Sequence, residues 1–271
     1  MVRSDAIDNA QSSDGSSHTS SGTDLERRNR ADEGAALLGQ ARFGRYLDDA
    51  AGDVDLAIAL CQWNQRFAGI LHSQLGYVEL AVRNTLDRQL RELSFREKGS
   101  QDWCLPGNAP DLVNRLIRGT LHDANDRARA DARQRVRRGS HRANAEVIHD
   151  DVLSQLMWGT WVKLIGNPET SEKTLDQQEL WMTATRNAFP YASDGETGRI
   201  KTSLGLQYIR RVRNNEAHYD NLYKEARNVN KIIGTSMSLL NSINPAFTQN
   251  WIDTAALRRA ARELNTILSA K

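Results

Sequence analysis

The chain has 271 residues, 39% hydrophobic and 26% charged, which suits one large globular domain, or two small ones, with a tail. No run of about 18 apolar residues is present, so we expect no membrane-spanning helix. The formal net charge of +2 is nearly balanced, so any binding of nucleic acid must depend on where the charges lie. Cys61 and Cys104 form no CxxC pattern, and no apolar stretch typical of a secretory signal follows Met1. We therefore expect reduced cysteines in a cytoplasmic protein.

Residues 1–33 are rich in Ser, Asp, Gly and Thr and poor in apolar residues, a composition that predicts a disordered tail. We expect residues 34–271 to form a single α-helical domain. Within it, apolar residues recur at helical spacing over 55–93, which predicts one long helix or two in line with a bend near Gly76. Asp53 or Asp55 is placed to cap its start.

The remaining segments also show helical rather than strand patterns. A loop is predicted over 99–110, and further helices are predicted from 110 onward and over 151–165, 219–240 and 253–268. Trp63, Trp158, Trp161 and Trp181 lie in apolar helical stretches, so we expect them in the core rather than as base-stacking platforms. The predicted fold class is therefore all-α, a helical bundle of about seven to nine helices.

The most informative stretch is 210–219, which holds Arg213, Asn214 and His218. Asn214 and His218 are four residues apart, so on a helix they lie on one face. Arg213 points to another side of the helix, but its long side chain can reach the face that holds Asn214 and His218. A cation, an amide and a group that titrates near neutral pH are what phosphodiester chemistry requires. The alternative is a surface helix with ordinary polar residues.

The spacing of arginine and histidine alone carries little information here. Five of the six histidines have an arginine at the Arg-x(4–6)-His spacing of one ribonuclease superfamily, because arginine is common in this chain. Requiring asparagine directly after the arginine leaves only Arg213-Asn214-x(3)-His218. The Arg-Asn pair also occurs at 83, 186 and 227 without the histidine.

Other residues could support such a site. Glu79 and Arg83 lie one turn apart, either as an intrahelical ion pair or as supports for residues 213–218 from a neighbouring helix. The segment 127–142 is dense in arginine, which would attract a phosphate backbone unless it is only a solvated face. The candidate RNA-binding residues are Arg133, Arg135, Arg137, Arg138, Arg210 and Arg211. No metal-binding motif is visible, so we expect neither metal nor cofactor.

Three blocks, in this order, resemble the Abi-like (abortive infection) proteins of bacteria. They are Arg45-Tyr46-Leu47 with Trp63-Asn64 and 79–84, then 156–164 with Leu180-Trp181 and Ala188-Phe189-Pro190, and finally 209–218. The resemblance covers about residues 40–245 and places the chain near the HEPN superfamily. That superfamily is α-helical, is often dimeric, and includes metal-independent endoribonucleases of phage defence and of toxin–antitoxin systems. Its Arg-Asn-x(3)-His motif corresponds to Arg213, Asn214 and His218. Tyr219 stands where the family often has a second histidine, and we expect it to support the site together with Glu79 and Arg83.

The resemblance and the residues together predict RNA cleavage in which His218 transfers a proton, Arg213 stabilises charge on the phosphate, and Asn214 orients either group. One histidine supplies one proton-transfer group, whereas cleavage uses an acid and a base, so we expect a homodimer that brings two sites together. Two alternatives stay open at this point. One is a non-catalytic module that binds RNA or protein, and the other is a toxin silenced by an antitoxin.

Overall fold

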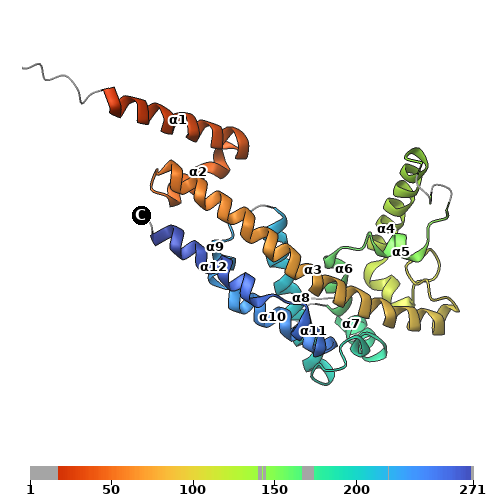
Figure 1. The fold of residues 1–271 in the computed structure, drawn as a ribbon. Coiled ribbons are helices and arrows are strands. Elements are labelled where there is room, and N and C mark those ends of the chain that lie inside the picture. Colours follow the sequence, from red (N-terminus) through yellow and green to blue (C-terminus); the bar gives the residue numbers. More distant parts are fainter. Residues whose placement is uncertain (1–17, 140–141, 143–144, 167–173, 219, 270–271) are drawn as a thin grey trace, which may run out of the picture. The chain divides into compact units, whose positions relative to one another are not determined.

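The computed structural model describes residues 18–139, 142, 145–166, 174–218 and 220–269, and these residues form helices and no strand (Figure 1). The all-α prediction is confirmed. The helices are α1 (His18–Leu38), α2 (Gln40–Asp49), α3 (Val54–Lys98), α4 (Asp111–Arg137), α5 (His149–Leu153), α6 (Trp158–Ile165), α7 (Thr174–Thr183), a 3₁₀ helix (Thr185–Ala188), α8 (Gly195–Ala217), α9 (Tyr223–Arg227), α10 (Val229–Ile243), α11 (Ala246–Asn250) and α12 (Thr254–Ser269). The described residues thus hold more helices than expected, because α5, α9 and α11 are five-residue segments.

The chain divides into two compact units, one of residues 1–63 with 265–271 and one of residues 64–264. In the first unit, residues 18–33 lie in α1, although their composition predicted a disordered tail. The rest of that predicted tail, residues 1–17, lies outside the described residues. Gly34 of α1 lies against the buried ring of Phe43, where a Cβ atom would be 2.6 Å from the ring. The missing side chain therefore lets an aromatic ring of α2 pack against α1, a contact that composition does not reveal.

The long helix predicted over 55–93 is present as α3. This helix is 45 residues long in total and continues without interruption through Gly76. Asp53 caps its start, since its Oδ1 accepts hydrogen bonds from the backbone N–H groups of Asp55 at 3.0 Å and Leu56 at 3.1 Å. The apolar stripe that predicted the helix is buried within the second unit, with Leu71, Val78, Leu86 and Leu90 fully inaccessible to solvent. The regular spacing of these residues explains why sequence alone located this helix well.

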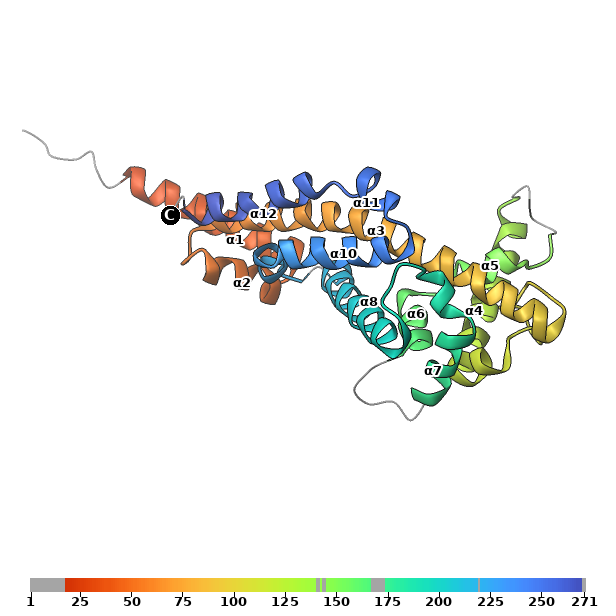
Figure 2. The ribbon, with the colours of Figure 1, turned by 90° about the horizontal axis from the view of Figure 1, so that it is seen from below.

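In the second unit, α8 packs against α6 and α10, and α8 and α10 lie close together in both views (Figures 1 and 2). Gly205 permits this close approach, because a Cβ atom there would be 3.1 Å from Leu239 of α10. The four tryptophans predicted in the core are buried, with exposed fractions of 0–4%. The indole N–H of Trp158 donates to the carbonyl oxygen of Leu206 at 2.9 Å, which joins α6 to α8. These contacts fix the helix that carries the candidate site.

Two predicted helices are divided in the structure. The apolar segment 151–165 forms α5 and α6, with residues 154–157 between them, and the segment 219–240 forms α9 and α10 after a start that lies partly outside the described residues. In both cases the helical pattern continues across the break, so the position of the break depends on tertiary contacts that periodicity does not encode.

Candidate functional site at the end of α8

Arg213 and Asn214 lie near the C-terminal end of α8, and His218 follows directly after the helix. The backbone N–H of His218 donates to the carbonyl oxygen of Asn214 at 3.0 Å, so the helical hydrogen-bond pattern reaches this residue. His218 therefore lies one turn beyond Asn214 on the same side of the helix axis, and both residues are exposed. The predicted supporting residue Tyr219 lies outside the described residues.

Arg213 faces α3. Its Nε lies 4.0 Å from Oε2 of Glu79, and the two side chains are 38% and 26% exposed. Three residues later, the buried carboxylate of Glu216 lies 3.3 Å from Nδ1 of His72, also on α3. At about 100° per residue, Asn214 and His218 point about 100° and 140° away from Arg213. The end of α8 thus presents Arg213 on one side and Asn214 with His218 on another.

Of the two predicted supports on α3, only Glu79 approaches the site. The guanidinium of Arg83 instead donates to the side-chain oxygen of the adjacent Asn84 at 3.4 Å. Neither an ion pair between Glu79 and Arg83 nor a contact from Arg83 to Arg213 is found among the described residues.

A groove of about 1470 Å³ runs between α8 and α10, and residues 191–193 and Pro245 also line it. Asn214 and Asn215 line it, whereas Arg213 and His218 do not. None of the described lining residues is acidic, and the cations that line it are Lys201, Arg210, Arg211 and Lys231. The predicted RNA-binding residues Arg210 and Arg211 thus lie in a groove whose charge is entirely positive.

One tyrosine holds two of these cations. The guanidinium carbon of Arg211 is 5.3 Å from the centre of the Tyr208 ring, and Nζ of Lys231 is 5.0 Å from the same point. Both distances are typical of cation–π contacts. Burial raises the pKa of Tyr208 above its usual value, so the ring stays neutral while it holds the cations.

Asp220 and Leu222 are held by a buried amide of α3 that sequence reasoning did not single out as functional. Nδ2 of Asn64 donates to the carbonyl oxygen of Asp220 at 3.0 Å, and its Oδ1 accepts from the backbone N–H of Leu222 at 2.8 Å. Asn64 is fully buried. Its signal in the sequence is an amide on the apolar face of a helix, where a buried polar group requires partners.

The arginines of 127–142 differ in their partners. Arg135 and Arg142 both bind the carboxylate of Asp151, at 3.1 and 3.0 Å. Burial alone would raise the pKa of Asp151, but these hydrogen bonds and that from the backbone of Ile148 hold it below its usual range. Arg135 therefore joins α4 to α5, whereas exposed Arg133, Arg137 and Arg138 form no hydrogen bond or ion pair with another described side chain. None of these arginines lines the groove.

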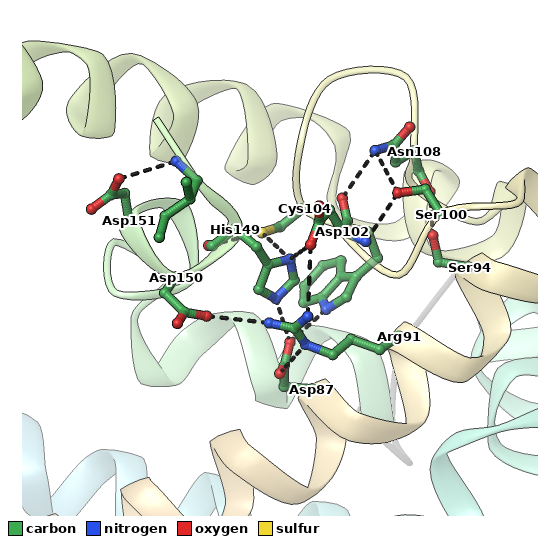
Figure 3. Close-up of polar contacts among 12 residues, drawn as sticks. Asp87, Arg91, Ser94, Ser100, Asp102, Cys104, Asn108, His149, Asp150 and Asp151 are labelled. Carbon is green, nitrogen blue, oxygen red and sulfur yellow. Dashed lines mark hydrogen bonds and ion pairs between the residues drawn. The ribbon is translucent and has the colours of Figure 1, made fainter. Parts of the chain in front are cut away.

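A second polar cluster lies far along α3, around the buried carboxylate of Asp87 (Figure 3). It accepts hydrogen bonds from the indole of Trp103 at 2.7 Å, from Nε2 of His149 at 2.8 Å and from Nε of Arg91 at 2.9 Å. Burial favours a higher pKa for Asp87, but the three donors outweigh it, and the pKa lies below its usual value. The cluster holds α3, the loop after it and α5 together.

Cys104 completes a chain of contacts in this cluster, because its Sγ lies 3.2 Å from Nδ1 of His149. Cysteine, histidine and aspartate in this order resemble a nucleophile, its base and an orienting acid. The thiol is nevertheless only 1% exposed, and burial raises its pKa, so it is neither accessible nor ionised. Both cysteines are free thiols, as the sequence predicted, and we interpret Cys104 as structural.

Within the described ranges, no helix is both long and apolar enough to cross a membrane. In the same part of the chain, no three His, Cys, Asp or Glu side chains gather in a way that could hold a metal ion. No protein-family model, curated protein or solved structure matches the chain. The functional argument therefore rests on the residues themselves.

Proposed function

We propose that the protein is a metal-independent endoribonuclease whose site lies at the end of α8. The observation that carries this proposal is the position of Asn214. It lines a groove whose charged lining residues are all cationic, and His218 stands one turn beyond it on the same side of α8. A groove of this charge attracts a phosphate backbone, and an exposed imidazole at its end can reach a phosphodiester bound there.

The reaction uses the ribose of the substrate as nucleophile. The 2′-oxygen attacks the neighbouring phosphorus, its proton passes to a base, and the bond from phosphorus to the 5′-oxygen breaks while that oxygen gains a proton. The products carry 2′,3′-cyclic phosphate and 5′-hydroxyl ends. His218 serves as base or acid and Asn214 orients the histidine or the phosphate, while the long side chain of Arg213 reaches round from the α3 side of the helix to stabilise the developing charge on the phosphate.

One copy of the site supplies one such imidazole, so a homodimer that brings two copies together would provide both acid and base. His72 is not placed for this role, because it contacts Glu216 on the α3 side of the helix. The resemblance to Abi-like proteins favours a cytoplasmic phage-defence or toxin–antitoxin system as the setting, with an antitoxin or a defence protein as a further partner.

The test incubates purified protein with RNA in EDTA and compares His218→Ala with His72→Ala. We expect cleavage in EDTA that is lost in His218→Ala and retained in His72→Ala, since His72 lies on the opposite side of α8. Cyclic-phosphate ends on the products would identify attack by the 2′-hydroxyl. Loss of cleavage in EDTA, or undiminished cleavage by His218→Ala, would refute the mechanism.

A non-catalytic RNA- or protein-binding module is the second candidate, and one contact favours it. Arg213 lies 4.0 Å from Glu79, so part of its charge is already compensated within the protein. In that case Arg213 positions α8 against α3, and the groove binds a ligand without cutting it. Salt-sensitive RNA binding with no cleavage by the wild-type protein would support this function.

A further inference from the structure

We propose that the groove between α8 and α10 binds the backbone of a single RNA strand and directs it along α8 to His218. This proposal rests on the proposed function. It names the surface that holds the RNA and the form of RNA that this surface accepts. It assigns binding to Arg211 and Lys231, which lie on opposite walls of the groove and contact the same tyrosine ring.

The first argument is the charge of the groove. Four of the described lining residues are cations and none is acidic, and the buried carboxylate of Glu225, which accepts from the amide of Asn215 at 2.9 Å, does not line the groove. Lys201 donates to the hydroxyl of Ser193 at 3.1 Å, and neither Lys201 nor Arg210 makes an ion pair with another described residue. Positive charges gathered on one surface repel one another, and a bound phosphate relieves that repulsion.

The second argument is the rigidity of two of the cations. Long cationic side chains normally lose considerable freedom when they bind a ligand. Tyr208 reduces this cost, because its ring already holds Arg211 from α8 and Lys231 from α10. Since these cations cover the ring, Tyr208 positions charge and does not stack on a base. The contact with the strand is therefore made mainly to phosphates, and we expect weak sequence preference.

The third argument is direction. A stripe of side chains runs along one face of α8. Its members follow one another at alternating intervals of three and four residues, the spacing that keeps side chains on one face of a helix. Its members are Lys201, Leu204, Tyr208, Arg211, Asn215 and His218. The first five line the groove, and His218 is the next position along the same face. The stripe is about 25 Å long, so it spans several phosphates before it reaches the imidazole.

The dimensions favour one strand over a duplex. Packed helices such as α8 and α10 have axes about 8–10 Å apart, and an A-form RNA duplex, with two backbones wound around stacked base pairs, is wider than that spacing. A duplex would contact only the rim. An acidic peptide could satisfy the charge but not the regular spacing of phosphates, and it is the competing occupant that the experiment must exclude.

Gly234 offers a test with a matched control. It lies in the groove wall on α10, and a Cβ atom there would meet nothing within 4 Å. Gly234→Glu therefore places a carboxylate in the groove without a clash, and Gly234→Gln adds nearly the same volume without the charge. Circular dichroism would establish that both variants fold. Both are made in the His218→Ala background, so that binding is measured without cleavage.

The assay is fluorescence anisotropy with a labelled 12-nucleotide single-stranded RNA, the same RNA as a duplex, and a polyglutamate peptide. We expect Gly234→Glu to bind the single strand at least about tenfold more weakly than Gly234→Gln. Arg211→Ala should lower the slope of log affinity against log salt by about 0.7, the value for one lost phosphate contact on a single strand.

Equal affinity of the two Gly234 variants would overturn the proposal, as would duplex or polyglutamate binding as tight as that of the single strand. The outcome is separable from that of the proposed function. If the groove binds RNA but the wild-type protein does not cut it, the cleavage mechanism is refuted and the RNA-binding role of the groove is supported. If the wild-type protein cuts RNA and Gly234→Glu binds it as well as Gly234→Gln does, the RNA-binding role of the groove is refuted and the cleavage mechanism is supported.

Discussion

Replacing Asp87 with asparagine should destabilise the protein by about 3 kcal/mol, although the side chain keeps its shape. Asp87 is 8% exposed and accepts three hydrogen bonds. Hydrogen bonds to a charged group contribute about 1.5–3 kcal/mol each. The amide oxygen of asparagine can still accept from Trp103 and His149, but without charge, while its NH₂ group faces Arg91, which is itself a donor. The expected loss is therefore less than the sum of three bonds and more than one.

The assay is urea unfolding at pH 7, followed by circular dichroism, with Asp150→Asn as the control. Asp150 binds the same arginine at 3.2 Å, but its side chain is 73% exposed, so its loss should cost less than about 1 kcal/mol. A difference between the wild-type protein and Asp87→Asn below about 1 kcal/mol would show that the cluster does not stabilise the fold.

The same pair of proteins gives a pH dependence with a definite sign. The pKa of Asp87 is lowered in the folded protein, so its contribution is fully present above the unfolded pKa of about 3.9. It is lost as the pH falls through the lower, folded value. The stability difference between wild type and Asp87→Asn should therefore shrink below about pH 4. A difference that grows in acid would contradict the assignment of an ionised Asp87.

Three further predictions concern packing and accessibility. Gly198→Ala should destabilise the protein by about 2–3 kcal/mol, because the new Cβ would lie 1.9 Å from the carbonyl oxygen of Ser193. Gly234→Ala should instead stabilise the protein by about 0.5–1 kcal/mol, because its Cβ would meet no atom within 4 Å. Thermal unfolding of the two variants would measure both effects. Asn64→Ala should cost about 1–3 kcal/mol, since it leaves a buried backbone N–H unpaired, and amide exchange should accelerate over 220–222. Cys104 should react with a thiol reagent only after unfolding, which mass spectrometry of native and urea-treated protein would reveal.

Sequence reasoning predicted the parts of the fold that depend on a sustained period. The apolar spacing of α3 and the burial of Trp161 and Trp181 follow from residues close together in the chain. The stripe from Lys201 to His218 was equally regular, but it mixes cations, an amide and a leucine, so no hydrophobic period marked it.

The rest depends on partners that are distant in sequence. Asn64 and the segment that it fixes are 156 residues apart, and no local pattern connects them. The direction of Arg213 toward Glu79 likewise requires the packing of α8 against α3. Spacing along α8 places Asn214 and His218 on one face and Arg213 on another, but only the arrangement of the helices shows that Arg213 lies against Glu79.

The double hydrogen bond of Asn64 has a consequence for how this protein can evolve. Aspartate has no donor for the carbonyl oxygen of Asp220, leucine has neither donor nor acceptor, and glutamine carries its amide one methylene farther from the backbone. In a saturation-mutagenesis library selected for folding, position 64 should therefore tolerate fewer replacements than the exposed positions 214 and 218. A residue with no role in the chemistry would then be the most restricted position around the site.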